Sequence, residues 1–277
     1  MTDERKEKYI NPYTDFGFKK LFGTEMNKDL LISFLNALFR DDQVIKDVKF
    51  LNSEQLGDGF RDRKAIFDVY CENERGEKFI VEMQKVEQNY FKDRSIYYAT
   101  FPIREQALRG DWNFQLKGVY TVGILNFVFL DNEYDEECYH HEVKLMDTKD
   151  KHVFFDKLTF VYLEMPKFNK TEDQLETMFD KWLFVLRNLS SLLERPAALQ
   201  ERVFEKLFRQ AEIAKFTPEE RQDYEESVKI YRDLKNSIDT AAWKEKVKIA
   251  REMKSDGVPT AAIVKYTKLP IEEIEAL

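Results

Sequence analysis

The chain has 277 residues, of which 43% are hydrophobic, enough for one large or two ordinary globular domains. Its net charge of −8 argues against a protein that coats nucleic acid with its whole surface, so any nucleic-acid contact must use a local basic rim. The 2 cysteines form neither a disulfide framework nor a zinc pattern. No apolar run approaches the ~18 residues of a membrane span, and residues 1–10 lack a signal-peptide core, so we expect a cytoplasmic protein without membrane contact.

The N-terminal segment predicts two helices. Residues 11–23 predict a helix that has Thr14 or Asp15 as its N-cap and Gly23 as its stop. Residues 27–39 predict an amphipathic helix. Its buried stripe consists of Leu30, Leu31, Phe34, Leu35 and Leu38.

A β-hairpin is predicted over residues 65–84. Residues 65–71 and 78–84 alternate between apolar and polar side chains, which is the periodicity of strands. Asn73 and Gly76, which lie between the two runs, tolerate the positive φ angles that a hairpin turn needs. The sequence therefore predicts two antiparallel strands joined by a short turn.

The register of this hairpin decides which side chains meet. Facing residue numbers in an antiparallel pair keep a constant sum, so a turn centred near Arg75 places Asp68 opposite Glu82. The same register places Ile66 opposite Gln84. Facing Cβ atoms lie about 4.5–5.5 Å apart, close enough for two carboxylates to share one hard cation. The alternative interpretation is a pair of polar positions on a solvated sheet face, although Asp is depleted inside strands.

These residues carry a resemblance to a known family. Asp68, a hairpin and then Glu82-Met83-Gln84 resemble the E-x-Q variant of the active-site motif of PD-(D/E)xK nucleases. The variant is found in the Rpn family of recombination-promoting nucleases, also described as transposases. The resemblance covers residues 1–130 and is looser beyond them. Further matching stretches are Asp15–Gly23, Asn27-Lys28, Phe34–Asn36, Arg94, Tyr97, Gly110 and Ile124–Phe127.

The resemblance implies a metal-dependent DNA endonuclease associated with recombination or mobile-element activity. Asp68 and Glu82 would hold Mg²⁺ or Mn²⁺, which would polarise a phosphoryl oxygen and activate water. Glu54 follows a short strand predicted at residues 47–52 and is a third candidate ligand. The competing interpretation is a catalytically inactive module, derived from a mobile-element nuclease, that binds nucleic acid or protein.

The remaining candidate site residues concern charge and substrate contact. Gln84 stands where these nucleases usually carry lysine, and an amide supplies no charge. Lys64, which strand parity places on the same face, or Lys85 would supply it. Arg94 and Tyr97 lie on one face of a helix predicted between Gln88 and Arg109, where they would contact backbone phosphates, with Lys85 as a further DNA contact.

Beyond the hairpin, strands are predicted at residues 119–130 and 158–165, and only helices follow. Helix-start signals occur at Thr171 and at Thr217, the second leading into a long charged helix that ends near Ser255. Two short helices then resemble a helix-turn-helix. Their acidic second segment favours packing or assembly over groove reading.

Together these patterns predict an α/β protein, similar to restriction endonucleases, with a mixed sheet flanked by helices and an all-helical C-terminal extension. We expect a nuclease-like domain over residues 1–168 and a helical region over residues 169–277. The helical region is also the candidate surface for a homodimer.

Overall fold

The computed structural model describes residues 7–40, 44–55, 65–107, 113–129 and 137–277. The chain forms two compact units, Met1–Tyr224 and Glu225–Leu277, which are described separately below. The helices that follow residue 168 are therefore shared between the two units. The domain boundary predicted at residues 168 and 169 concerns independent folding and stays a prediction.

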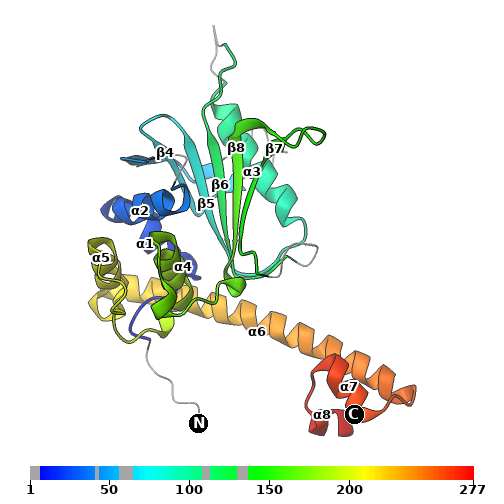
Figure 1. The fold of residues 1–277 in the computed structure, drawn as a ribbon. Helices are drawn as coiled ribbons and strands as arrows, with labels where there is room; N and C mark the ends of the chain where they lie inside the picture. Colours follow the sequence, from blue (N-terminus) through cyan, green and yellow to red (C-terminus); the bar gives the residue numbers. More distant parts are fainter. Residues whose placement is uncertain (1–6, 41–43, 56–64, 108–112, 130–136) are drawn as a thin grey trace. The chain divides into compact units, whose positions relative to one another are not determined.

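The first unit is built on a six-stranded mixed sheet, which Figure 1 shows with its flanking helices. The strands are β1 (Val48–Phe50), β4 (Val69–Asn73), β5 (Lys78–Gln84), β6 (Val119–Leu125), β7 (His140–Met146) and β8 (Val153–Glu164). Their order across the sheet is β1-β4-β5-β6-β8-β7. Strands β5, β6 and β8 run parallel to their neighbours among these three, and the other neighbouring pairs are antiparallel. The predicted mixed sheet is confirmed.

The described residues also form eight α-helices. They are α1 (Asp15–Phe22), α2 (Lys28–Leu38), α3 (Phe91–Glu105), α4 (Met178–Asn188), α5 (Arg202–Ala211), α6 (Pro218–Ser255), α7 (Thr260–Thr267) and α8 (Ile271–Glu275). Thr14 is the N-cap of α1, where its hydroxyl accepts the N–H of Gly17 at 3.0 Å. The stripe predicted for α2 is buried. Both N-terminal helices are therefore confirmed.

Helices cover both faces of the sheet. Phe101 of α3 packs with Ile80 of β5 on one face. Phe39, directly after α2, contacts the rings of Phe79 and Tyr120, with centroids 6.1 and 5.1 Å away. Because Phe79 and Ile80 are consecutive in β5, their side chains point to opposite faces. The predicted arrangement of a sheet flanked by helices is thus confirmed.

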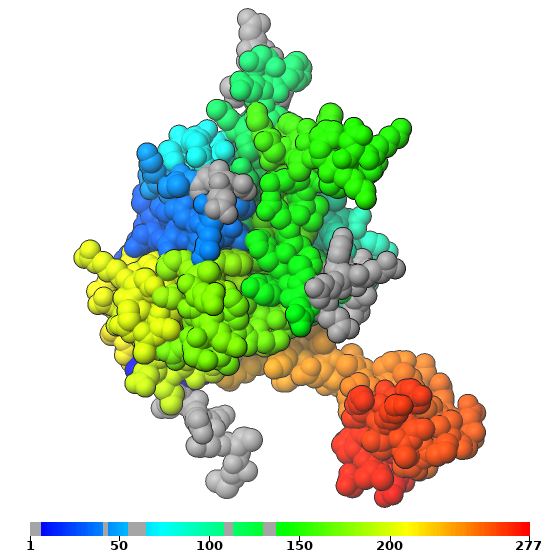
Figure 2. All heavy atoms as spheres, viewed as in Figure 1, coloured from blue at the N-terminus to red at the C-terminus, as the bar shows by residue number. Residues whose placement is uncertain are grey.

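Helices α4 and α5 pack against α1 and α2. Trp182 of α4 is fully buried, and its ring lies 5.7, 5.9 and 5.1 Å from those of Phe22, Phe34 and Phe204, measured between centroids. Figure 2 shows the yellow-green atoms of this region in continuous contact with the blue atoms of the N-terminal helices. This aromatic cluster makes α4 and α5 part of the first unit's core.

The turn between β4 and β5 follows the sequence pattern closely. Gly76 has a φ of +77°, a conformation that favours glycine. The Asn73 side chain contributes through hydrogen bonds, because its Oδ1 accepts the N–H groups of Arg75 and Glu77, each at 3.0 Å. These contacts fix the turn and, with it, the hairpin register.

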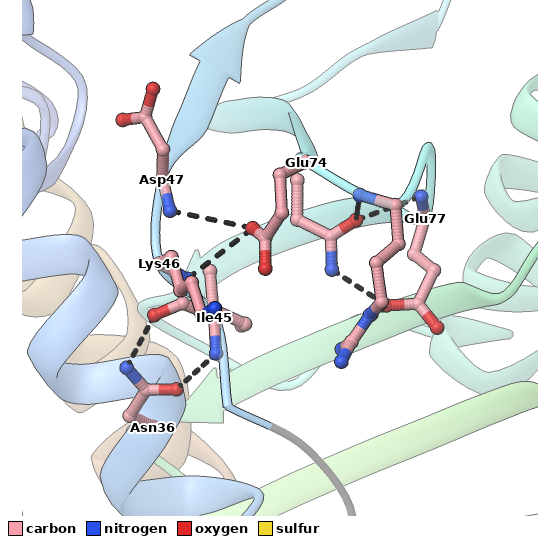
Figure 3. A network of polar contacts seen from close by, with 8 residues as sticks. Asn36, Ile45, Lys46, Asp47, Glu74 and Glu77 are labelled. Atoms are coloured by element: carbon pink, nitrogen blue, oxygen red, sulfur yellow. Dashed lines mark hydrogen bonds and ion pairs between the residues drawn. The ribbon is translucent and has the colours of Figure 1, made fainter.

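The same turn is tied to the chain that leads into β1, as Figure 3 shows. The Glu74 carboxylate accepts the N–H groups of Lys46 and Asp47, both at 3.3 Å. The Asn36 side chain of α2 bonds both the N–H and the carbonyl of Ile45, at 2.7 and 2.8 Å. Helix α2 and the β4–β5 turn therefore position the same short segment.

One predicted strand is wrong in its extent. Residues 65–71 do not form one strand: β3 (Ala65–Ile66) pairs with β2 (Glu54–Gln55) in a separate two-stranded sheet. The chain then bends at Asp68 before β4 begins. Phe67 consequently packs with Tyr70 and Phe101, on the α3 side of the sheet. Ile66 faces Glu54 rather than Gln84.

Other boundaries also differ from expectation. Helix α3 spans Phe91–Glu105, a shorter range than the predicted Gln88–Arg109, and continues through Pro102. Strand β8 begins at Val153 rather than Leu158, because the segment His140–Met146 forms β7, for which no strand was predicted, and pairs with it. Thr171 caps only a short 3-10 turn, and α4 begins after Thr177.

The second unit is helical. The C-terminal part of α6 packs with α7 and α8 around a core of Val247, Ala250, Ile263, Leu269 and Ile274. Helix α6 ends at Ser255, as predicted, and the two short helices expected after it are α7 and α8. No helix within the described ranges combines the length and the apolar character that crossing a membrane requires.

We expect Trp182→Ala to lower the free energy of unfolding by about 3–5 kcal/mol, because it opens a cavity among buried aromatic rings. Urea unfolding followed by circular dichroism measures this change. Trp243→Ala is the matched control, since Trp243 is 47% exposed, and should cost less than about 1 kcal/mol. Equal losses in the two variants would contradict a shared core of α4 with the N-terminal helices.

Candidate active site

Asp68 and Glu82 meet at the end of the β4–β5 pair. Val69 faces Val81, so the register continues to Asp68 opposite Glu82, as the constant sum of residue numbers predicts. Glu82 lies within β5, whereas Asp68 lies in the bend that precedes β4. The sequence therefore predicted the meeting of the two acids correctly, although it placed Asp68 inside a strand.

Two main-chain hydrogen bonds hold the carboxylates together. The N–H of Asp68 donates to Oε1 of Glu82 at 3.1 Å. The N–H of Met83 donates to Oδ2 of Asp68 at 2.8 Å. Glu82 is thus oriented by the backbone amide of Asp68, and Asp68 by the backbone amide that follows Glu82.

Burial makes it costly to ionise both acids. Glu82 is only 7% exposed, and burial, followed by repulsion from Asp68, raises its pKa from 4.5 to about 8. The pKa of Asp68 is also raised overall, mainly by burial and in part by the nearby negative charge of Asp15. Part of this increase is offset by the hydrogen bond from the Met83 N–H and by the positive charges of Lys19 and Lys85.

Gln84 and Arg94 continue the site along the same face. Gln84 Nε2 donates to Oε2 of Glu82 at 3.3 Å. The Arg94 guanidinium donates to Oε1 of Gln84 at 2.6 Å and also to Oε1 of Gln88. Arg94 also lowers the pKa of Glu82 through its charge. Three of the predicted site residues, Glu82, Gln84 and Arg94, are thereby linked in one chain of hydrogen bonds.

A small cavity borders Glu82 beneath α3. Three of its lining residues, Thr121 and Gly123 of β6 and Tyr162 of β8, are far apart in sequence from the motif and were not predicted. Gly123 faces both Glu82 and Tyr162 across the sheet. A Cβ on Gly123 would approach Tyr162 Cδ1 to 3.2 Å, so glycine leaves room for this ring. The full lining is Glu82, Phe91, Arg94, Ser95, Tyr98, Thr121, Gly123 and Tyr162.

Two hydroxyl groups of this cavity differ in their bonding. Tyr162 shares a 2.6 Å hydrogen bond with Ser95. Thr121 is 3% exposed, and its Oγ1 has no hydrogen-bond partner among the residues that the structure describes. A buried hydroxyl without a partner is costly, so Thr121 is a natural contact for a water molecule beside Glu82. The sequence signal for this region was Gly123 within an apolar strand, which marks a close approach.

The other predicted site residues are placed as follows. Glu54 is exposed on β2, in the small sheet rather than beside Glu82. Tyr97 is exposed on α3, whereas its neighbour Tyr98 lines the cavity. Lys85 lies one residue beyond β5 and acts on Asp68 through its charge. Lys64 lies outside the described residues.

The paired acids fit a hard divalent cation. Both supply oxygen ligands, and a cation beside them would relieve the repulsion that raises the pKa of Glu82. Across residues 7–40, 44–55, 65–107, 113–129 and 137–277, no group of three or more His, Cys, Asp or Glu side chains is arranged to hold a metal. Any ion at Asp68 and Glu82 would therefore complete its coordination largely with water or substrate oxygens.

Comparison with known proteins assigns the family. The model of the PD-(D/E)XK nuclease family transposase matches residues 12–241, which include the sheet, the two acids and Arg94. Comparison with curated proteins and with solved structures gave no match. Because the family model spans most of the chain, this protein belongs to the PD-(D/E)XK nuclease family transposases.

Proposed function

We propose that this protein is a metal-dependent endonuclease that hydrolyses DNA phosphodiester bonds. The observation that carries the proposal is the Asp68–Glu82 pair, which lies in register and is held by two reciprocal main-chain hydrogen bonds. Family membership supports a nuclease or mobile-element role. We further propose that the reaction serves recombination or element movement, as in the Rpn family, and that the protein acts on DNA in the cytoplasm.

The residues around the two acids have separate proposed tasks. Asp68 and Glu82 would hold Mg²⁺ or Mn²⁺, and that metal would polarise a phosphoryl oxygen and make its bound water more acidic. The N–H groups of residues 68 and 83 fix the two carboxylates in place. Gln84 orients Glu82 through its amide.

Four further residues are proposed to contact the DNA or the reacting phosphate. Arg94 is a proposed contact for a phosphate oxygen beside the acids, since a guanidinium has N–H groups beyond those that bond Gln84 and Gln88. Lys85 and Tyr97 are proposed DNA contacts, and Lys64 a catalytic cation.

A non-catalytic module is the competing function. It is favoured by the burial of Glu82 and its repulsion from Asp68, which raise its pKa to about 8 and make the loss of its proton, which a bound metal requires, less favourable. Such a module would bind DNA or a partner without cleaving it. Metal-independent binding of DNA without nicking would support this alternative.

Assembly through the C-terminal helices is also proposed. The helical region over residues 169–277 would pair two copies of the chain. Light scattering on the purified protein would show twice the mass of 33.1 kDa, and a single-chain mass would exclude the dimer.

We expect the purified protein to nick supercoiled plasmid DNA in the presence of Mg²⁺ or Mn²⁺. Nicking should be absent when EDTA removes the metal. Asp68→Asn and Glu82→Gln should each lower the nicking rate about 100-fold or more, because each removes a charged oxygen ligand while keeping its shape. Gel analysis of plasmid forms measures the rate.

Asp93→Asn is the matched control, since Asp93 is an exposed acid on α3 next to Arg94. It should retain the wild-type nicking rate. Nicking that survives in Asp68→Asn would indicate a contaminating nuclease or a different active site, and would overturn the proposed role of the pair.

The metal-free protein should lose stability as the pH rises, because Glu82 keeps its proton up to about pH 8 when folded but only to about pH 4.5 when unfolded. Between these two pH values the folded state binds one more proton than the unfolded state. The stabilisation of the folded state by that proton is lost as the pH rises through about 8. Glu82→Gln removes this dependence. Thermal unfolding in EDTA should show the variant gaining stability over wild type between about pH 5 and about pH 9.

The control for this pH series is again Asp93→Asn, whose melting temperature should follow that of the wild type throughout. If Glu82→Gln also follows the wild type across the whole range, Glu82 ionises at an ordinary pH and the description of a buried, repelled carboxylate is wrong.

A further inference from the structure

The motif of this chain lacks a positive charge. The family takes its name from a motif whose final residue is lysine, and in this chain the sequence Glu82-Met83-Gln84 ends in a neutral amide. A lysine there would place a cation beside the glutamate. Gln84 cannot do this, so a charge must come from another element or be absent.

We propose that Arg94 supplies this missing charge by acting through the amide of Gln84. This inference rests on the proposed nuclease function. It assigns to Arg94 of α3 a task that the motif gives to a residue of the strand. Arg94 is thus a positioning and charge-supplying residue rather than only a general contact for DNA.

The hydrogen bonds determine the orientation of the amide. A guanidinium only donates, so the atom of Gln84 that faces Arg94 at 2.6 Å must be the carbonyl oxygen Oε1. The amide nitrogen Nε2 then faces Oε2 of Glu82 at 3.3 Å. A flipped amide would place its N–H groups against the guanidinium and its oxygen against the carboxylate, and both contacts would be repulsive. The chain from Arg94 through Gln84 to Glu82 therefore has a single favourable direction.

The amide carries the effect of the cation to the acid. A charged donor at Oε1 polarises the amide, which strengthens the N–H group that points at Glu82. The charge of Arg94 also reaches Glu82 directly, since it favours the ionised carboxylate. Both effects stabilise negative charge on Glu82, as a lysine in the strand would.

The Arg94 side chain is fixed in place before any substrate binds. Its guanidinium also donates to Gln88. It lies over the rings of Phe91 and Tyr98, at 5.4 and 5.7 Å from their centroids. Cation–π contacts and two amide acceptors restrain the group on several sides, so the charge need not reorganise during the reaction.

Other cations near the acids are placed differently. Lys19 is engaged by Asp15 at 3.0 Å. Lys19 and Lys85 act through space on Asp68, the other acid. Arg94 is the cation that the structure joins to Gln84 by a hydrogen bond, which is why it is favoured over Lys85 for this role.

The test exchanges the position of the charge. Arg94→Gln should lower the plasmid-nicking rate in Mg²⁺ about 100-fold. Gln84→Lys, placed in the Arg94→Gln background, restores a cation at the motif position and should raise the rate at least about tenfold above that of Arg94→Gln alone. In the wild-type background, Gln84→Lys should instead lower the rate, because its ammonium would face the guanidinium of Arg94.

A second readout needs neither metal nor DNA. The side-chain amide signals of Gln84 in a ¹H–¹⁵N spectrum, assigned by their loss in Gln84→Ala, should shift in Arg94→Gln because the polarising donor is gone. Arg104→Gln is the matched control, since Arg104 lies on the same helix and stacks on Phe101 at 5.6 Å. It should change neither the Gln84 signals nor the nicking rate.

The outcomes separate the two proposals. If the wild type nicks DNA and Arg94→Gln does so within about threefold of the wild-type rate, the role of Arg94 is overturned while the proposed nuclease function stands. The same holds if the double variant is no faster than Arg94→Gln alone. A wild-type protein that does not nick DNA overturns the proposed function and the catalytic role of Arg94 with it. Unchanged Gln84 signals in a folded Arg94→Gln variant overturn the link through the amide whatever the activity.

Discussion

The site depends on the pairing of the bend at Asp68 with strand β5. Two amide groups, those of Asp68 and Met83, each donate to the carboxylate of the opposing segment. This exchange brings two acids together in a buried place where their repulsion would otherwise drive them apart. The turn around Gly76 and the sheet behind it hold the two segments in the register that makes the exchange possible.

The electrostatics of the molecule follow from this arrangement. The chain carries a net charge of −8, yet cations from separate segments gather near the acids. Lys19 comes from α1, Lys85 from the end of β5 and Arg94 from α3, and each acts on one of the two carboxylates. An acidic protein can therefore present a locally balanced site to a polyanion, without the basic surface of a general DNA-coating protein.

Local signals in the sequence were sufficient for part of the fold. The turn residues and the constant sum of residue numbers gave the pairing of Asp68 with Glu82, because both depend only on neighbouring residues. The alternation of apolar residues gave no warning of the break before β4. Phe67 continues the pattern, but its ring turns to the α3 side to join Tyr70 and Phe101, which is a tertiary contact.

The rest of the candidate site could not be read from the motif. Thr121 and Tyr162 reach Glu82 only through the parallel pairing of β5, β6 and β8, which places residues from three distant segments side by side. The contact of Arg94 with Gln84 likewise depends on where α3 crosses the sheet.

The start of a helix also could not be located from capping residues alone. Thr171 and Thr177 both form capping boxes, and only Thr177 begins an α-helix.

The bend at Asp68 has a mechanical consequence. The β4–β5 ladder stops at Val69, so the backbone that carries Asp68 is anchored on one side by the sheet and on the other by the N–H of Phe67, which donates to Ser53 at 2.9 Å. A small displacement of the aspartate would leave every rung of the ladder unbroken. The spacing of the two acids is therefore set by the two hydrogen bonds that Asp68 exchanges with β5, and not by the ladder itself.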